Sequence, residues 1–92
     1  MIKHVDGEND KESVFLYTLS TCVWCKKTKQ FLIDINAKYD YIDVDLLVGA
    51  EQEKTMKELA KVNPQGGFPT ILINKEKIIV GFQPDAIKEA LV

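Results

Sequence analysis

Two cysteines separated by two residues are the part of this sequence whose type and spacing suit chemistry. Cys22 and Cys25 form a C-x-x-C motif, a spacing at which one thiol attacks a disulfide and the other releases the product by closing an internal disulfide. The motif follows an apolar run over residues 13–19 and precedes a helical pattern, with Ser20 and Thr21 as the expected N-cap hydroxyls. Cys22 is therefore expected at a helix N-terminus. Unpaired N–H groups and the helix dipole favour a thiolate there. We therefore predict that Cys22 is the nucleophile and that Cys25, one turn further in, resolves the mixed disulfide.

Two other uses of these cysteines are weaker hypotheses. Free cysteines are often buried packing residues, but a strand, a C-x-x-C motif and a helix in this order are typical of redox sites. A structural zinc site needs four ligands, and the chain has one histidine, His4, and no second C-x-x-C motif. We therefore predict a redox pair and no metal ligands.

The first half of the chain contains the elements that must position the motif. Residues 13–19 predict a buried strand, and residues 39–45 predict a second one. The helix between them is expected to end near Asn36. Its expected inner face consists of Trp24, Thr28, Phe31, Leu32 and Ile35, and its mostly outward positions are Lys26, Lys27, Lys29 and Gln30. Residues 50–62 predict a second helix, with an inner face marked by Met56, Leu59 and Ala60.

The second half predicts a loop over residues 63–69, an antiparallel hairpin of residues 70–73 and 77–80, and a short helix over residues 84–91. The order β-α-β-α-β-β-α implies parallel pairing in the first half and antiparallel pairing in the hairpin. We therefore expect an α/β fold with a four-stranded mixed sheet and helices on both faces. Residues 1–12 form an N-terminal extension to the domain of residues 13–92, and residues 1–5 offer an additional edge strand.

Length and charge narrow the classes of function. A chain of 92 residues has room for one domain. Its net charge of −2, with lysine as its only strongly basic residue type, argues against nucleic acid as a partner. No apolar run approaches the roughly 18–20 residues of a membrane span, and no targeting pattern is evident. We expect a cytoplasmic monomer that is not attached to a membrane.

Three motifs together resemble the glutaredoxin family. They are residues 17–25, 67–70 and 81–85, and the resemblance covers about residues 13–92. It implies a thioredoxin-like fold and a cis proline at Pro69, beside the cysteines, with the Phe68 backbone pairing with an extended substrate. Aromatic residues near a reactive sulfur suit a binding groove, and the expected substrate-binding residues are Tyr17, Trp24, Lys26, Phe68, Pro69, Gly81 and Phe82.

Within that family the chain departs from the pattern of proteins that use glutathione. Leu19 stands three residues before the first cysteine, where many glutaredoxins have lysine, and residues 81–85 are closer to the NrdH-redoxin branch. The resemblance therefore implies an electron-donating redoxin that reduces a protein disulfide, for example in ribonucleotide reductase. Its electrons would come from a disulfide reductase or a small thiol, and no tightly bound cofactor is expected. The alternatives are a glutathione-dependent glutaredoxin and, less favoured, an iron–sulfur or metal carrier.

Overall fold

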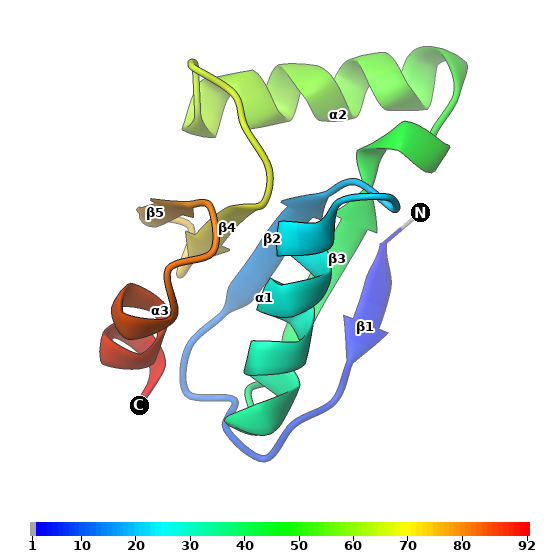
Figure 1. Cartoon of the computed structure of the whole chain (residues 1–92). Helices are drawn as coiled ribbons and strands as arrows, with labels where there is room; N and C mark the ends of the chain where they lie inside the picture. Colours follow the sequence, from blue (N-terminus) through cyan, green and yellow to red (C-terminus); the bar gives the residue numbers. More distant parts are fainter. Residues whose placement is uncertain (1) are drawn as a thin grey trace.

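The computed structural model describes residues 2–92, which form a five-stranded sheet with the order β1-β3-β2-β4-β5 (Figure 1). The strands are β1 (Lys3–Val5), β2 (Val14–Thr18), β3 (Tyr39–Asp43), β4 (Thr70–Ile73) and β5 (Lys77–Val80). The helices are α1 (Val23–Asp34), α2 (Gly49–Val62) and α3 (Pro84–Leu91), with a short 3-10 turn, η1 (Val44–Leu46), before α2. The element order therefore agrees with the predicted β-α-β-α-β-β-α once β1 is added at the start.

The fifth strand is the additional edge strand that the sequence offered within residues 1–5. It pairs antiparallel with β3, with Lys3 opposite Tyr41, while residue 1 lies outside the described residues. Further along, the backbone of Gly7 lies directly against the end of α1, because a Cβ there would come within 2.5 Å of the Asn36 carbonyl oxygen. The N-terminal segment therefore joins the sheet and contacts the turn after α1.

The register of the three central strands brings distant parts of the chain to one edge of the sheet. β2 pairs in parallel with β3, with Thr18 opposite Asp43, and antiparallel with β4, with Tyr17 opposite Thr70. Because β4 runs against β2, the start of β4 lies beside the end of β2. The loop that leads into α1, the end of β3 and the loop that precedes β4 consequently share this edge.

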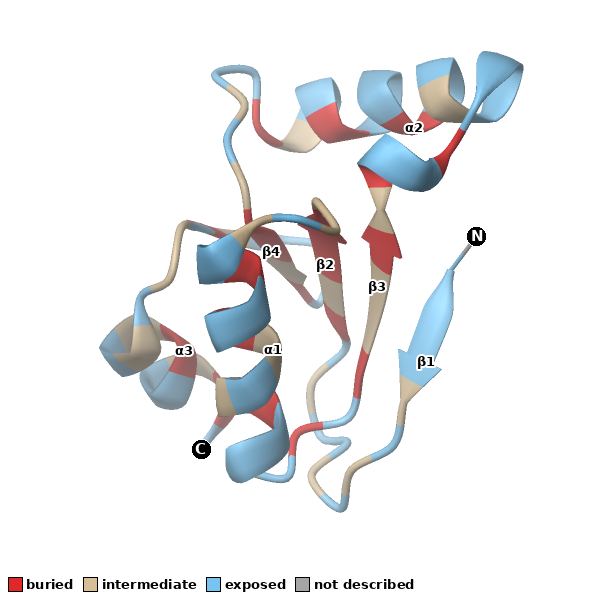
Figure 2. Ribbon diagram, turned by 45° about the vertical axis from the view of Figure 1, so that its right-hand side comes forward, coloured by how far each residue is buried: buried red, intermediate tan, exposed pale blue. Residues whose placement is uncertain are grey.

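The helices cover both faces of the sheet, as predicted (Figures 1 and 2). Alternate residues of a strand face opposite sides, so Leu16 packs in a cluster with Leu32 of α1 and Ile87 of α3, whereas Tyr17 packs in a cluster with Leu59 of α2. These two clusters are called the α1 face and the α2 face below. Each buried leucine contributes roughly 1.5–3 kcal/mol relative to an exposed one.

The structure corrects several predicted details of the helices. Met56 is 43% exposed, and Ala60 is also exposed, because α2 touches the sheet through a narrow stripe whose buried residues are Thr55 and Leu59. Trp24, expected on the inner face of α1, is 55% exposed. Lys29, expected outside, has a side chain only 19% exposed.

The boundaries of three elements also differ from the predicted ones. The first predicted strand covers Val14–Thr18 instead of residues 13–19. The second predicted strand ends at Asp43 instead of residue 45, because the chain turns through η1 to place Val44 and Leu47 in the α2-face core. The second helix begins at Gly49, one residue before its predicted start. Asn36 does mark the stop of α1: it adopts a left-handed backbone conformation with φ of 57°, which asparagine tolerates better than most residues.

Candidate active site

Cys22 is the N-cap residue of α1. Its backbone is extended, with φ of −81° and ψ of 118°, and its Sγ accepts a hydrogen bond from the backbone N–H of Cys25 at 3.1 Å. No acidic residue stands in the first turn of α1, so the positive end of the helix dipole is not opposed by a side chain of that turn. The Cys22 sulfur is half-buried and is a free thiol. These features leave the Cys22 thiol partly accessible at the positive end of a helix.

Cys25 has a contrasting environment three residues further along α1. It is completely buried and is also a free thiol. Burial, followed by its hydrogen bond to Cys22, raises the pKa of the Cys25 thiol to about 12. At neutral pH this sulfur therefore keeps its proton, and the predicted division between an accessible and an inner cysteine agrees with the geometry.

The loop before β4 is fixed at the edge where α1 begins. The Phe68–Pro69 peptide is cis, which confirms the expectation drawn from the family resemblance. The Pro69 carbonyl oxygen accepts the Gly81 N–H at 2.8 Å, and the Thr70 hydroxyl donates to the Gly67 carbonyl oxygen at 2.8 Å. These bonds hold the backbone around Phe68 in one conformation beside the first turn of α1.

Asn63 anchors the other end of this loop and was not singled out from the sequence. It is buried, and its amide nitrogen donates to the Gly66 carbonyl oxygen at 2.7 Å and to the Thr70 hydroxyl at 3.1 Å. An asparagine directly after a helix and before a glycine-rich loop is a recognisable turn signal, but its bond to Thr70 depends on the folded loop.

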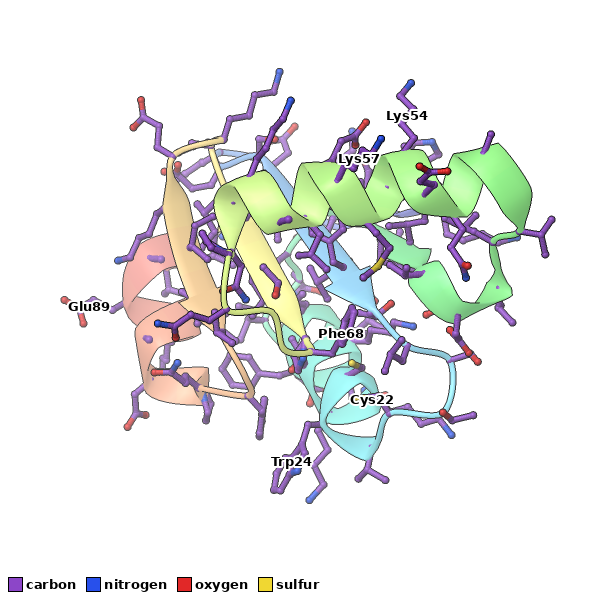
Figure 3. All side chains as sticks on the ribbon, turned by 90° about the horizontal axis from the view of Figure 1, so that it is seen from above. Cys22, Trp24, Lys54, Lys57, Phe68 and Glu89 are labelled. Carbon is purple, nitrogen blue, oxygen red and sulfur yellow. The ribbon has the colours of Figure 1, made fainter. Side chains whose placement is uncertain are left out.

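Aromatic rings connect the start of α1 with the segment between β5 and α3. Trp24 stacks on Phe82, with ring centroids 6.2 Å apart and an interplanar angle of 24°, and Phe82 also meets Phe31 edge to face. The Lys27 ammonium lies 4.8 Å from the centre of the Trp24 ring. Figure 3 shows Trp24 projecting from the end of the molecule where Cys22 and Phe68 also lie. The structure thus brings Trp24, Phe68, Pro69, Gly81 and Phe82 to the edge that carries Cys22.

Two of the predicted substrate-binding residues, Tyr17 and Pro69, have buried side chains. Tyr17 is buried in the α2-face core, where its ring meets Phe15 edge to face with centroids 5.0 Å apart. Phe68 packs against this core from the loop, so Tyr17 lies beneath the loop and presents little surface to a substrate. Lys26 is exposed on α1.

A polar cluster under α1 is a further feature that the sequence did not indicate. The Lys29 ammonium is 3.3 Å from a carboxylate oxygen of Asp43, and the Thr18 hydroxyl donates to the same oxygen at 2.6 Å. Thr18 and Asp43 are the last residues of β2 and β3 and are opposite each other in the register. The available signal was the spacing of Cys25 and Lys29, four residues apart on one helix.

Within residues 2–92 no helix combines the length and the apolar character required to cross a membrane. The same residues contain no group of three or more His, Cys, Asp or Glu side chains placed to hold a metal ion.

Known proteins of similar sequence and structure have the same overall fold. The family model described as Glutaredoxin matches residues 14–78. The crystal structure of the glutaredoxin from Methanosarcina mazei Go1 is 49% identical in sequence, with a TM-score of 0.87, and the match covers 98% of this chain and 86% of that one. The Methanosarcina acetivorans methanoredoxin is 46% identical, with a TM-score of 0.85 and coverage of 89% and 86%.

The NrdH-redoxin from Escherichia coli is a more distant match. It is 22% identical, with a TM-score of 0.67 and coverage of 84% of this chain and 92% of that one, so the likeness is one of fold. The matched family model spans most of the chain, including Cys22 and Cys25. The chain therefore belongs to the glutaredoxin family and has the thioredoxin-like fold of that family.

Proposed function

We propose that this protein is a dithiol–disulfide oxidoreductase that reduces protein disulfides, with Cys22 as the attacking thiol and Cys25 as the resolving thiol. The observation that carries the proposal is the contrast between the two sulfurs. Cys22 is partly accessible at the N-terminus of α1 and accepts an N–H hydrogen bond, whereas Cys25 is completely buried behind it. An accessible thiolate attacks a substrate, and a buried neighbour reacts only with a partner already held on Cys22.

The reaction then takes place in two exchanges. The Cys22 thiolate attacks one sulfur of the substrate disulfide, forming a mixed disulfide and releasing the other substrate sulfur as a thiolate, which takes a proton from solvent. Cys25 next loses its proton to solvent and attacks the Cys22 sulfur. The bond between Cys22 and the substrate breaks, and the substrate leaves as a second thiol. The protein loses two electrons in forming the Cys22–Cys25 disulfide, and the substrate gains them.

The surface around Cys22 is better suited to a protein segment than to a small ligand. Val23 is 60% exposed and Trp24 is 55% exposed, and Trp24 continues into Phe82 through their ring stack. The backbone at Phe68, presented by the cis bond to Pro69, is in place to pair with an extended segment, a common mode of peptide recognition. We infer that Trp24, Phe68, Gly81 and Phe82 form the surface that a substrate segment covers, with the exposed Lys26 at its rim. Pro69, whose side chain is fully buried, would shape the backbone beneath that surface.

Single-cysteine variants test the two roles. Cys25→Ser should accumulate a mixed disulfide with a cystine-containing protein substrate, because the first exchange proceeds and the second cannot. Cys22→Ser should form no mixed disulfide and show no turnover. Mass spectrometry after quenching with acid measures the trapped species. Turnover by Cys22→Ser together with none by Cys25→Ser would reverse the assignment.

We further propose that glutathione is a poor reductant for this protein. A dedicated site needs cationic or N–H donors for the carboxylates of glutathione, and Leu19 supplies no charge near Cys22. Asp45 approaches the same loop: the Ser20 hydroxyl and backbone N–H both donate to its carboxylate, at 2.5 and 2.8 Å. These bonds lower the pKa of Asp45, so its negative charge persists at neutral pH. Asp85 adds a carboxylate to the first turn of α3.

Parallel reduction assays test this choice of reductant. The oxidised protein is offered glutathione with its reductase or, separately, thioredoxin reductase with NADPH, and NADPH consumption is followed. We expect slow glutathione-coupled turnover and faster reduction by the dedicated enzyme. Leu19→Lys should raise the glutathione-coupled kcat/KM by roughly 3- to 10-fold, the effect of one new solvent-exposed hydrogen bond of about 0.7–1.4 kcal/mol. Brisk glutathione-coupled turnover by the unmodified protein would exclude the proposal.

A further inference from the structure

Lys29 is a largely buried cation that the two exchanges described above do not use. Lysine side chains are mostly exposed, yet this one is 19% exposed and lies between α1 and the sheet. Its ammonium is 3.3 Å from the Asp43 carboxylate and 3.9 Å from the centre of the Tyr41 ring. Both contacts attract a positive charge. The ammonium is therefore held at one place under α1.

The Asp43 carboxylate, which pairs with the Lys29 ammonium, is also fixed by its own contacts. Its side chain is 17% exposed and accepts the Thr18 hydroxyl at 2.6 Å. That hydroxyl lies within 3.2 Å of the Ile42 carbonyl oxygen as well. Since Thr18 and Asp43 end adjacent parallel strands, the sheet determines where the carboxylate lies. The Lys29 ammonium thus has a rigid support at the edge of the sheet that carries the cysteines.

Cys25 and Lys29 are four residues apart on α1, so their side chains lie on the same side of the helix, one turn apart. The titratable groups near Cys25 are Cys22 and Lys29 on α1 and, through Lys29, Asp43 and Tyr41 on β3. Burial and Cys22 raise the pKa of the Cys25 thiol, whereas a hydrogen bond with the Leu19 backbone and, to a smaller extent, the positive charge of Lys29 lower it. Lys29 is therefore a cation that works against the cost of a buried thiolate.

We infer that Lys29 is a positioning residue for the resolving exchange, where its fixed positive charge stabilises the transient Cys25 thiolate. The inference rests on the proposed function. In this step the Cys25 proton passes to solvent, the thiolate sulfur bonds to the Cys22 sulfur, and the negative charge leaves on the substrate sulfur. Lys29 exchanges neither electrons nor protons with the reacting groups, because it acts only through the field at Cys25. Asp43, Tyr41 and Thr18 keep its ammonium in range.

Dithiodipyridine separates the two exchanges, because each of them releases one absorbing thiopyridone. In the full-length protein the first release reports the attack by Cys22 and the second reports resolution by Cys25. We expect Lys29→Met to slow the second release on the order of 10-fold at pH 7, because the Cys25 thiolate then has no positive charge nearby. The first release should change by less than about 2-fold. Lys29→Arg keeps the charge and should restore the second release to within about 3-fold of the original rate.

Two further variants keep the result interpretable. Lys57→Met removes an equally positive charge from the exposed surface of α2, where Lys57 points away from the site (Figure 3), and should leave both releases unchanged. If Lys29→Met is unstable because Asp43 is left unpaired, the double variant Lys29→Met/Asp43→Asn removes both charges and should still resolve slowly.

The outcomes also separate this inference from the proposed function. An unchanged second release in Lys29→Met, or an Arg variant as slow as the Met variant, would overturn the role of Lys29 and leave the division of labour between the cysteines intact. A protein that released only one thiopyridone before any substitution would overturn the proposed function, and the Lys29 inference with it.

Discussion

The helices on the two faces of the sheet differ in how many of their residues they bury. On the α1 face, the eight-residue α3 buries Ile87 and Leu91, and α1 buries Leu32 and Thr28 together with Cys25. On the α2 face, the fourteen-residue α2 buries only Thr55 and Leu59. Figure 2 shows most of α2 as exposed ribbon with a narrow buried stripe toward the sheet.

The difference in packing concerns the candidate active site, because the two cysteines belong to one of the two faces. Cys25, Lys29 and the beginning of α1 belong to the densely packed face, where side chains have little freedom to move. The proposed sulfur exchange needs such rigidity, because Cys25 would have to meet Cys22 in a defined geometry. The α2 face contributes Phe68 through the loop that follows α2. We therefore expect the α1 face to tolerate change poorly and the α2 face to tolerate it better.

The largest expected effect is on stability. Leu32 is fully buried on the α1 face and Leu59 is almost fully buried on the α2 face. Leu32→Ala should lower the free energy of unfolding by about 3–5 kcal/mol, and Leu59→Ala by about 2–3 kcal/mol, because the thinner layer can relax into the cavity. Urea titration followed by circular dichroism measures both values. Equal losses would show that the two faces do not differ in packing.

An intermediate effect should appear at alkaline pH. Burial raises the pKa of the Cys25 thiol from 9.0 to about 12, so between these values the unfolded chain loses the proton while the folded protein keeps it. The stability that the protonated Cys25 thiol contributes is complete below about pH 9. It is lost as the pH rises toward 12, by about 1.4 kcal/mol per pH unit.

A pair of variants isolates that contribution. Cys22→Ser, which keeps Cys25 as the single thiol and removes the part of the pKa shift that Cys22 causes, is compared with Cys22→Ser/Cys25→Ala by urea titration at a series of pH values. Other alkaline groups are common to both proteins, among them Tyr39, whose pKa burial raises to about 12. The stability difference should therefore change only above pH 9. A difference that stays constant up to pH 11 would mean that the Cys25 thiol is not buried in solution.

The smallest expected effect is at Met56, which the periodicity of α2 placed inside and the structure places outside. Met56 is 43% exposed, so Met56→Ala should change the free energy of unfolding by less than about 0.5 kcal/mol, as for most surface substitutions. Leu59→Ala, three residues along the same helix, is the matched comparison. A loss of stability at Met56 as large as that at Leu59 would mean that Met56 lies on the inner face of α2, as the sequence predicted.

The predicted and observed faces of α2 differ for a physical reason. Apolar character is the signal that periodicity analysis uses, and Met56, Leu59 and Ala60 share it. The residue that accompanies Leu59 in the buried stripe is Thr55. Its spacing of four residues from Leu59 fits a helix, but threonine carries a hydroxyl and does not count as apolar in a periodicity analysis. Because α2 buries so few residues, its own sequence defines the buried face only weakly. Packing against the sheet then determines which face is buried.

The thiol pair was predictable because everything that positions it is local. A strand ends, a helix begins at Cys22, and Cys25 lies one turn further in; each step follows from neighbouring residues. The N-cap itself is Cys22 instead of the expected Ser20 or Thr21. The hairpin of β4 and β5 was predictable in the same way, since Asn74 and Lys75 form a short turn with positive φ between two apolar runs.

The surroundings of the pair were determined only by the tertiary structure. Pro69 meets Gly81, Trp24 stacks on Phe82, and Lys29 reaches Asp43 because the strand register brings these segments to one edge of the sheet. Register arises from packing both faces of the sheet at once, and a shift of one residue would turn each side chain to the opposite face. The sequence by itself therefore determined where the two cysteines lie at the start of a helix, and the assembled sheet determined which groups surround them and whether Lys29 of α1 faces solvent or Asp43.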